Sequence, residues 1–213
     1  MDFSRNAGRL EVVCGSMFSG KSEELIRRIR RAEFAKRKTQ LFKHSYDNRV
    51  TLCHVHAHSG DMLAAYAVNS PQELASFVLD DTEVIGIDEV QFFDPEIVLL
   101  IDHLVASGKR VVAAGLDLDF RGVPFGCMPI LLAIADEVLK LKAVCMKSGK
   151  DAHFTQRVIN GQPAKHSDPI ILIGAQECYE ARSRETFEID YTPLAEYIGT
   201  HFSSKNDTQQ NSL

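Results

Sequence analysis

Short apolar runs alternate with helix-like periodicity along much of the chain. The apolar runs predict buried strands at residues 10–14, 39–43, 64–68, 84–88 and 110–116. After the first run, apolar residues at helical spacing predict a helix from residue 22 to about residue 38. These residues are Leu25, Ile26, Ile29 and Ala32.

Two further helices have recognisable start signals. Ser70 followed by Pro71 provides a capping side chain and a proline at the first helical position. Pro95 opens another helix, which we expect to end near Ser107 because Gly108 follows. Strands that alternate with helices favour an α/β fold, in which a parallel sheet is covered by helices on both faces.

The remaining sequence departs from this alternation. Residues 44–62 are polar and irregular, which indicates a long loop or a hairpin. Beyond Leu141 the chain breaks into short polar pieces, with one strand candidate at 169–173. We therefore expect a core, a small second lobe and a disordered tail, at 9–141, 142–192 and 203–213 respectively.

The composition excludes several classes of protein. The chain is 45% hydrophobic and 25% charged, as soluble globular proteins are. Its net charge of -5 provides no excess of positive charge for general nucleic-acid binding. It contains neither a run of about 18 apolar residues, as a membrane span requires, nor an N-terminal signal-peptide core. The five cysteines are scattered and odd in number, which favours reduced thiols and a cytoplasmic protein.

A glycine-rich turn follows the first predicted strand and reads G-x-x-x-x-G-K-S. Strand, glycine turn and helix form the context in which backbone N–H groups cradle nucleotide phosphates. Lys21 would lie near the β- and γ-phosphates of ATP, and the hydroxyl of Ser22 would be a ligand of Mg²⁺. We expect the whole turn to bind ATP: Gly15, Ser16, Met17, Phe18, Ser19, Gly20, Lys21 and Ser22.

A carboxylate pair ends the predicted strand at 84–88. Asp88 is expected to hold Mg²⁺, and we include Val90 and Gln91 with the pair in the ATP-binding set. Glu89 would activate water in an ATPase that acts on nucleic acid, or take the proton of an acceptor hydroxyl in a kinase. A third alternative is a nucleotide-binding protein without turnover. The motor ATPase lacks support because the chain offers no basic surface for DNA.

Three motifs in series resemble the type II thymidine kinases of bacteria, animals and large DNA viruses. They read GSMFSGKS, IDEVQFF and AGLDLDFRGVPFG, and the resemblance covers roughly residues 9–190. It implies a P-loop NTPase-like fold with a small C-terminal lasso or ribbon lobe. It also implies transfer of the γ-phosphoryl of ATP to the 5′-hydroxyl of thymidine or deoxyuridine, with Mg²⁺ and with Glu89 as general base. A cytoplasmic homotetramer is the assembly that the resemblance implies.

The same resemblance implies a set of residues around the nucleoside. Phe120 and Phe125 would pack on the base, and Thr155 would lie near the thymine methyl. Arg49, in a D-x-R element, would lie near the phosphates of ATP. The expected nucleoside-binding residues are Met17, Leu116, Phe120, Phe125, Thr155, Ile170, Ile171, Leu172, Ile173, Gly174 and Tyr179.

The chain departs from the family at the zinc ribbon that relatives carry in the small lobe. Two C-x-x-C pairs supply the zinc ligands in those relatives. Here the four positions hold Cys145, Ser148, Ser183 and Thr186, so one thiol remains. Neutral hydroxyls are poor ligands in structural zinc sites. We therefore expect no structural zinc.

A cluster of histidines and a run of basic residues are each expected to form no metal-binding or ligand-binding site. His54, His56 and His58 would share one face of a strand and could bind a transition metal, but we favour a polar, partly exposed strand. Basic residues are frequent on and after the first predicted helix: Arg27, Arg28, Arg30, Arg31, Lys36, Arg37 and Lys38. We expect them on the solvated or subunit-facing side of that helix.

Overall fold

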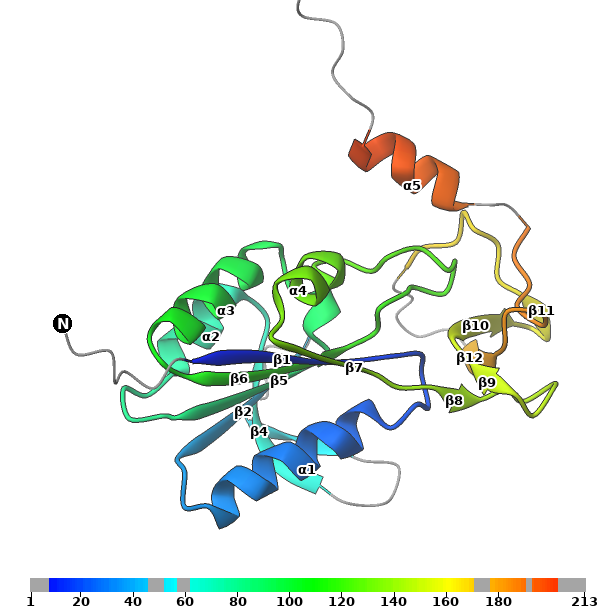
Figure 1. The fold of residues 1–213 in the computed structure, drawn as a ribbon. Helices are drawn as coiled ribbons and strands as arrows, with labels where there is room; N and C mark the ends of the chain where they lie inside the picture. The colour runs from blue at the N-terminus through cyan, green and yellow to red at the C-terminus, as the bar shows by residue number, and fades with distance from the viewer. Residues whose placement is uncertain (1–7, 46–51, 57–61, 171–176, 191–192, 203–213) are drawn as a thin grey trace, which may run out of the picture.

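The computed structural model describes residues 8–45, 52–56, 62–170, 177–190 and 193–202. Its largest sheet has seven strands in the order β3-β4-β2-β5-β6-β1-β7 (Figure 1). The strands are β1 (Arg9–Cys14), β2 (Thr39–His44), β3 (Leu52–His56), β4 (Met62–Val68), β5 (Val84–Asp88), β6 (Arg110–Gly115) and β7 (Glu137–Lys140). All neighbouring strands are parallel except β3 and β4, so the predicted, mostly parallel α/β sheet is confirmed.

Helices cover both faces of this sheet. Helix α1 (Lys21–Phe34) lies on one face, and α2 (Pro71–Phe77), α3 (Glu96–Ala106) and α4 (Met128–Ile134) lie on the other (Figure 1). Consecutive residues of β1 alternate between the two cores: Val12 packs with the cluster that includes residues of α3 and α4, and Val13 packs with α1. Because both faces are buried, the central strands β5 and β6 are apolar along most of their length rather than alternating.

The helix ends show which signals the sequence carries. Helix α1 ends at Phe34, so the predicted end near residue 38 is wrong. Lys36 has a left-handed φ of 58°, and the N–H groups of Lys36 and Arg37 bond back to carbonyls of the last turn. This hydrogen-bond pattern usually has glycine at the left-handed position. Because lysine occupies that position here, the sequence lacks the usual signal for the end of the helix. Gly108 holds the equivalent position after α3, where the predicted end is confirmed.

Residues 44–62 include one arm of a hairpin, because β3 pairs with β4 in antiparallel register. His54 of β3 is exposed, as expected for a polar strand. The side chains of His56 and His58 lie outside the described part of the structure. None of the described helices is long and apolar enough to cross a bilayer.

The C-terminal part forms two small sheets and a helix. The elements are β8 (Ala143–Val144), β9 (Asp151–Ala152), β10 (Phe154–Ile159), β11 (Gln162–Pro163), β12 (Glu177–Arg182) and α5 (Pro193–Phe202). Strands β8 and β9 pair as a hairpin, and β10 lies between β11 and β12. The predicted strand at 169–173 is wrong for Pro169 and Ile170, which belong to no strand. Its other residues, and the tail at 203–213, lie outside the described residues.

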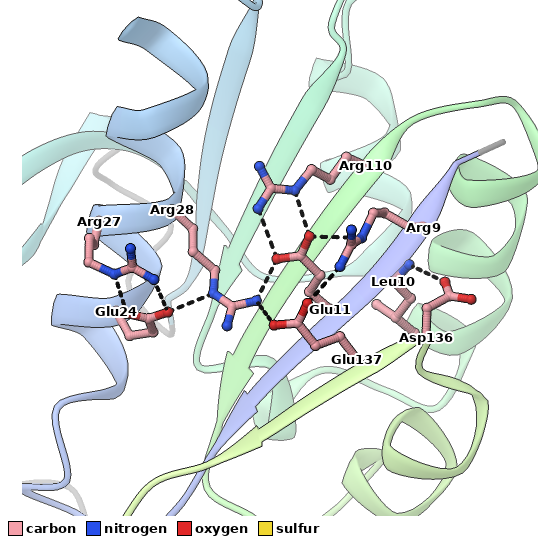
Figure 2. Close-up of polar contacts among 9 residues, drawn as sticks. All are labelled: Arg9, Leu10, Glu11, Glu24, Arg27, Arg28, Arg110, Asp136 and Glu137. Atoms are coloured by element: carbon pink, nitrogen blue, oxygen red, sulfur yellow. Dashed lines mark hydrogen bonds and ion pairs between the residues drawn. The ribbon is translucent and has the colours of Figure 1, made fainter. Parts of the chain in front are cut away.

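A buried ion-pair network ties β1 to its neighbours (Figure 2). The side chain of Glu11 is 2% exposed and lies against Arg28 of α1, while Arg110 of β6 donates two hydrogen bonds to it. Arg9 and Glu137 extend the network to β7. Burial alone would raise the pKa of Glu11, but the hydrogen bonds from Arg110 and Arg28 bring it below its usual value. The expected solvated position is wrong for Arg28, which is buried because Glu11 supplies a buried counter-charge.

Candidate functional site

The site begins at the turn between β1 and α1, which we call the glycine loop (residues 15–22). Gly15 has a φ of 146°, and a Cβ built there would lie 2.4 Å from the carbonyl oxygen of Leu141. Gly20 caps α1 with a left-handed φ of 88°. Glycine is therefore required at both ends of the loop, the first for space and both for backbone conformation. The loop delivers the chain to the N-terminus of α1, where unpaired N–H groups favour anions.

Lys21 places its charge inside this loop. Its Nζ donates a hydrogen bond to the carbonyl oxygen of Ser16 at 2.7 Å. Burial lowers the pKa of Lys21, although the nearby carboxylates of Glu89 and Asp88 oppose this shift. An ammonium has three N–H donors, so the bond to Ser16 leaves donors for a phosphate.

Asp88 and Glu89 lie beside the glycine loop, at the end of β5. Asp88 is 3% exposed, and Ser22 donates a hydrogen bond from Oγ to Asp88 Oδ2 at 3.3 Å. Burial, and then the charge of Glu89, raise the pKa of Asp88. A hydroxyl and a carboxylate that converge in this way are the oxygen ligands that Mg²⁺ prefers, so the two residues fit that ion.

Glu89 has an unusual backbone. Its φ is 56°, in the left-handed region that few non-glycine residues adopt. Its N–H donates to Asp88 Oδ1 at 3.1 Å, and the short 3₁₀ helix η1 (Val90–Phe92) follows at once. Strain of this kind is found at functional sites, where the surrounding structure must hold it in place.

One cavity of about 270 Å³ joins the glycine loop, Glu89 and the C-terminal strands. This volume is near the lower end of small-molecule pockets, about 300 Å³. Lys21, Ser22 and Glu89 line one part of it. Every described residue expected at the nucleoside lines it too, namely Met17, Leu116, Phe120, Phe125, Thr155, Ile170 and Tyr179. Arg49 and residues 171–174 lie outside the described residues, so their predicted roles stay predictions.

Hydrogen bonds join the glycine loop to the C-terminal strands. The N–H of Met17 donates to Thr155 Oγ1 of β10 at 3.0 Å. Ser16 Oγ donates to the carbonyl oxygen of Ala152 at 3.3 Å. The residue expected near the thymine methyl therefore also supports the loop expected to hold phosphates.

Several residues of the site were not foreseen from the sequence. The guanidinium of Arg157, a fully buried residue, lies over the ring of Phe120 at 4.9 Å from its centroid. The ring of Phe92 packs edge-on against Phe125, with centroids 5.4 Å apart. Asp119 accepts hydrogen bonds from backbone N–H groups of its own loop, an arrangement typical of aspartate in turns. That turn chemistry is a signal the sequence carries, whereas nothing nearby in sequence marks Arg157.

The four positions of the family's zinc ribbon come together, but as a hydrogen-bonded cluster. Thr186 Oγ1 lies 3.1 Å from Cys145 Sγ and 3.1 Å from Ser183 Oγ, which is itself 3.1 Å from Ser148 Oγ. Burial raises the pKa of the Cys145 thiol, but hydrogen bonds from Ser148 and Thr186 outweigh it and lower the pKa to about 5. Three hydroxyls that satisfy one another do not fit a structural zinc ion.

A comparison of the sequence with known protein families identifies a match over most of the chain. The sequence profile described as thymidine kinase matches residues 8–187. The match spans the glycine loop, the Asp88–Glu89 pair and the C-terminal strands that line the cavity. It covers most of the chain, and the protein therefore belongs to the thymidine kinase family.

Proposed function

We propose that the protein transfers the γ-phosphoryl of ATP to the 5′-hydroxyl of thymidine or deoxyuridine in the cavity described above, with Glu89 as general base. The observation that carries the proposal is that one cavity is lined by Lys21, Ser22 and Glu89 and by the aromatic residues expected at the base. Phosphoryl donor, acceptor hydroxyl and base must meet within a few ångströms for such a transfer.

The glycine loop would hold the phosphates of ATP, as the P-loop of an NTPase-like core at 9–141. Its backbone N–H groups and Lys21 would neutralise the negative oxygens. Ser22 and Asp88 would hold Mg²⁺, which when bound supplies positive charge to the transferring phosphoryl group. Val90 is 0% exposed, so its contribution to the ATP site would come from its backbone. Arg49 remains a proposed neighbour of the phosphates.

Glu89 would orient the 5′-hydroxyl and take its proton as the bond to phosphorus forms. The transition state of phosphoryl transfer is loose, so the base acts mainly by positioning the hydroxyl. At the other end of the cavity, Phe120 and Phe125 would pack against the base, and Thr155 would lie near its methyl group. Tyr179 and the backbone of residues 170–174 would close over the nucleoside.

Residues 142–192 would form the lobe that covers the nucleoside. We propose that the cluster of Cys145, Ser148, Ser183 and Thr186 holds this lobe without zinc, because its members bond to one another. A homotetramer is proposed from the family resemblance alone, and a cytoplasmic location from the resemblance and from the five scattered cysteines. An ATPase that acts on nucleic acid is not favoured, because the family match supports a nucleoside kinase.

The experiment is a direct assay of product formation. Purified protein with ATP, Mg²⁺ and thymidine should form thymidine monophosphate, and Glu89→Gln should lower kcat by roughly 100-fold or more. Binding of a non-hydrolysable ATP analogue should be largely unchanged in this variant. ATP hydrolysis that does not depend on thymidine, with no nucleotide product, would contradict the proposal.

A further inference from the structure

The buried side chain of Gln91 connects two residues that line the cavity, Glu89 and Leu116. The residue is 2% exposed and lies in η1, two positions after Glu89. Its Nε2 donates a hydrogen bond to Glu89 Oε2 at 2.7 Å. Its Oε1 accepts a hydrogen bond from the N–H of Leu116 at 3.1 Å. Leu116 itself lines the nucleoside end of the cavity.

The chemistry of the two partners fixes the orientation of this amide. A backbone N–H can only donate, so the oxygen of Gln91 must face Leu116. The NH₂ group must then face Glu89, whose Oε2 accepts its hydrogen bond.

Two glycines leave the space that the bridge occupies. A Cβ at Gly115, at the end of β6, would lie 2.5 Å from Gln91 Oε1. A Cβ at Gly126 would lie 2.4 Å from the carbonyl oxygen of Gln91. Both distances are shorter than any van der Waals contact, so a side chain at either position would displace Gln91. Gly115 thus packs against the side-chain amide of Gln91, and Gly126 packs against its backbone carbonyl.

The bridge also supports a strained residue. Glu89 has a left-handed backbone, and it lines the cavity. In the described structure, the amide of Gln91 is a partner at hydrogen-bond distance. A buried amide whose nitrogen and oxygen are each hydrogen-bonded is a rigid support, because breaking either hydrogen bond costs the free energy of leaving a buried polar group unpaired.

We infer that Gln91 is a positioning residue for the phosphoryl transfer. Its amide holds the carboxylate of Glu89 at a fixed position relative to the backbone of Leu116, which lines the part of the cavity proposed for the nucleoside. The expected contact of Gln91 with ATP stays a prediction, and the positioning role concerns its side-chain amide. The inference rests on the proposed role of Glu89 as general base.

The test is a double-mutant cycle between positions 89 and 91. Gln91→Met keeps a similar length and removes both hydrogen bonds. We expect it to lower kcat by about 10- to 100-fold, with KM for ATP and thymidine changed by no more than about 3-fold. In a Glu89→Gln background the same substitution should change kcat by less than about 3-fold, because the carboxylate that it positions is already gone.

Gln40 provides a matched control. It is also buried, at 6% exposed, and also bridges two segments, from Nε2 to Phe77 O and from Leu79 N to Oε1. Gln40→Met should reduce thermal stability and leave kcat within about 2-fold at a temperature where the variant is folded. A loss of kcat in Gln40→Met equal to that in Gln91→Met would show a general packing effect and overturn the inference.

Gln91→Glu separates the two bonds of the bridge. It keeps an acceptor for the N–H of Leu116 but replaces the neutral donor to Glu89 with a second carboxyl group, which either repels the Glu89 carboxylate or shares one proton with it, so kcat should fall as in Gln91→Met. Full activity of this variant, or an undiminished effect of Gln91→Met in the Glu89→Gln background, would overturn the inference. If Glu89→Gln alone leaves kcat unchanged, the proposed base is wrong, and this result is distinct from a failure at position 91.

Discussion

Replacing Glu11 by glutamine removes the centre of the ion-pair network in Figure 2. Oε2 of Glu11 lies 2.5 Å from Nη1 of Arg28, and Oε1 lies 2.7 Å from Nε of Arg110 and 3.0 Å from Nε of Arg9. A glutamine would keep one oxygen acceptor and place an NH₂ group against donors that are already positive. The substitution is nearly isosteric, so it tests charge and hydrogen bonding rather than packing.

The structure sets the expected size of the effect. Removing one partner of a buried ion pair costs about 3–5 kcal/mol, because the other charge stays buried. Arg28 is the partner at risk, since its side chain is 8% exposed. It keeps Glu24 at 2.8 Å and Glu137 at 2.9 Å, and both soften the loss. We therefore expect the free energy of unfolding to fall by about 3 kcal/mol, at the lower end of this range.

Urea unfolding of both proteins, followed by circular dichroism, measures this difference. Glu83→Gln is the matched control, because Glu83 pairs with Arg37 at the surface, where their side chains are 42% and 54% exposed. Exposed pairs contribute roughly 1 kcal/mol or less. A loss below this size for Glu11→Gln would refute the reasoning that burial makes the network strong.

The pH dependence provides a second check. The pKa of Glu11 is lowered in the folded protein from its ordinary value of 4.5. Its contribution to stability is therefore present above pH 4.5 and is lost as pH falls through the lower, folded-state pKa. The gap in unfolding free energy between wild type and Glu11→Gln should be constant near neutral pH and shrink below pH 4.5. A gap that is unchanged in this acid range would contradict the assignment.

Two further predictions concern the hydroxyl cluster and the glycine loop. Ser148→Cys, Ser183→Cys and Thr186→Cys together should create a tetrahedral thiolate site that binds about one zinc per chain by elemental analysis, because the four positions already converge; Ser148→Cys alone should bind none, and zinc in the wild type would contradict the metal-free lobe. Gly15→Ala should destabilise the protein and abolish binding of an ATP analogue, as measured by calorimetry, because the added Cβ would lie 2.4 Å from the carbonyl oxygen of Leu141. Normal binding by this variant would contradict the conclusion that the loop requires glycine at position 15.

The parallel core was largely predictable because its signals are local. The strand at Val84–Asp88 was predicted at its observed bounds, and Ser70 caps α2 through the N–H of Glu73 as its sequence indicates. The glycine loop was visible because a phosphate cradle depends on consecutive residues. The end of α1 was missed because Lys36 adopts the backbone that Gly108 adopts after α3.

The C-terminal part was poorly predicted because long-range contacts determine it. Strand β10 pairs with β12, whose partner residues lie 18 to 28 positions away in the chain. Buried Arg157 and Gln91 are polar in sequence, and only their partners in space explain their positions. The same holds for Glu11 and Arg28, whose mutual burial no local pattern reveals.

The bond from Met17 to Thr155 has a consequence for how the chain can be divided. The glycine loop, which we propose holds the phosphates of ATP, is hydrogen-bonded to a strand that lies more than a hundred residues later in the chain. A shortened protein that ends after β7 would thus lose a support of the glycine loop together with the part of the cavity that Thr155, Ile170 and Tyr179 line. The sites that we propose for the phosphoryl donor and the acceptor therefore depend on one set of contacts, and we expect that neither can be transferred to another protein without the other.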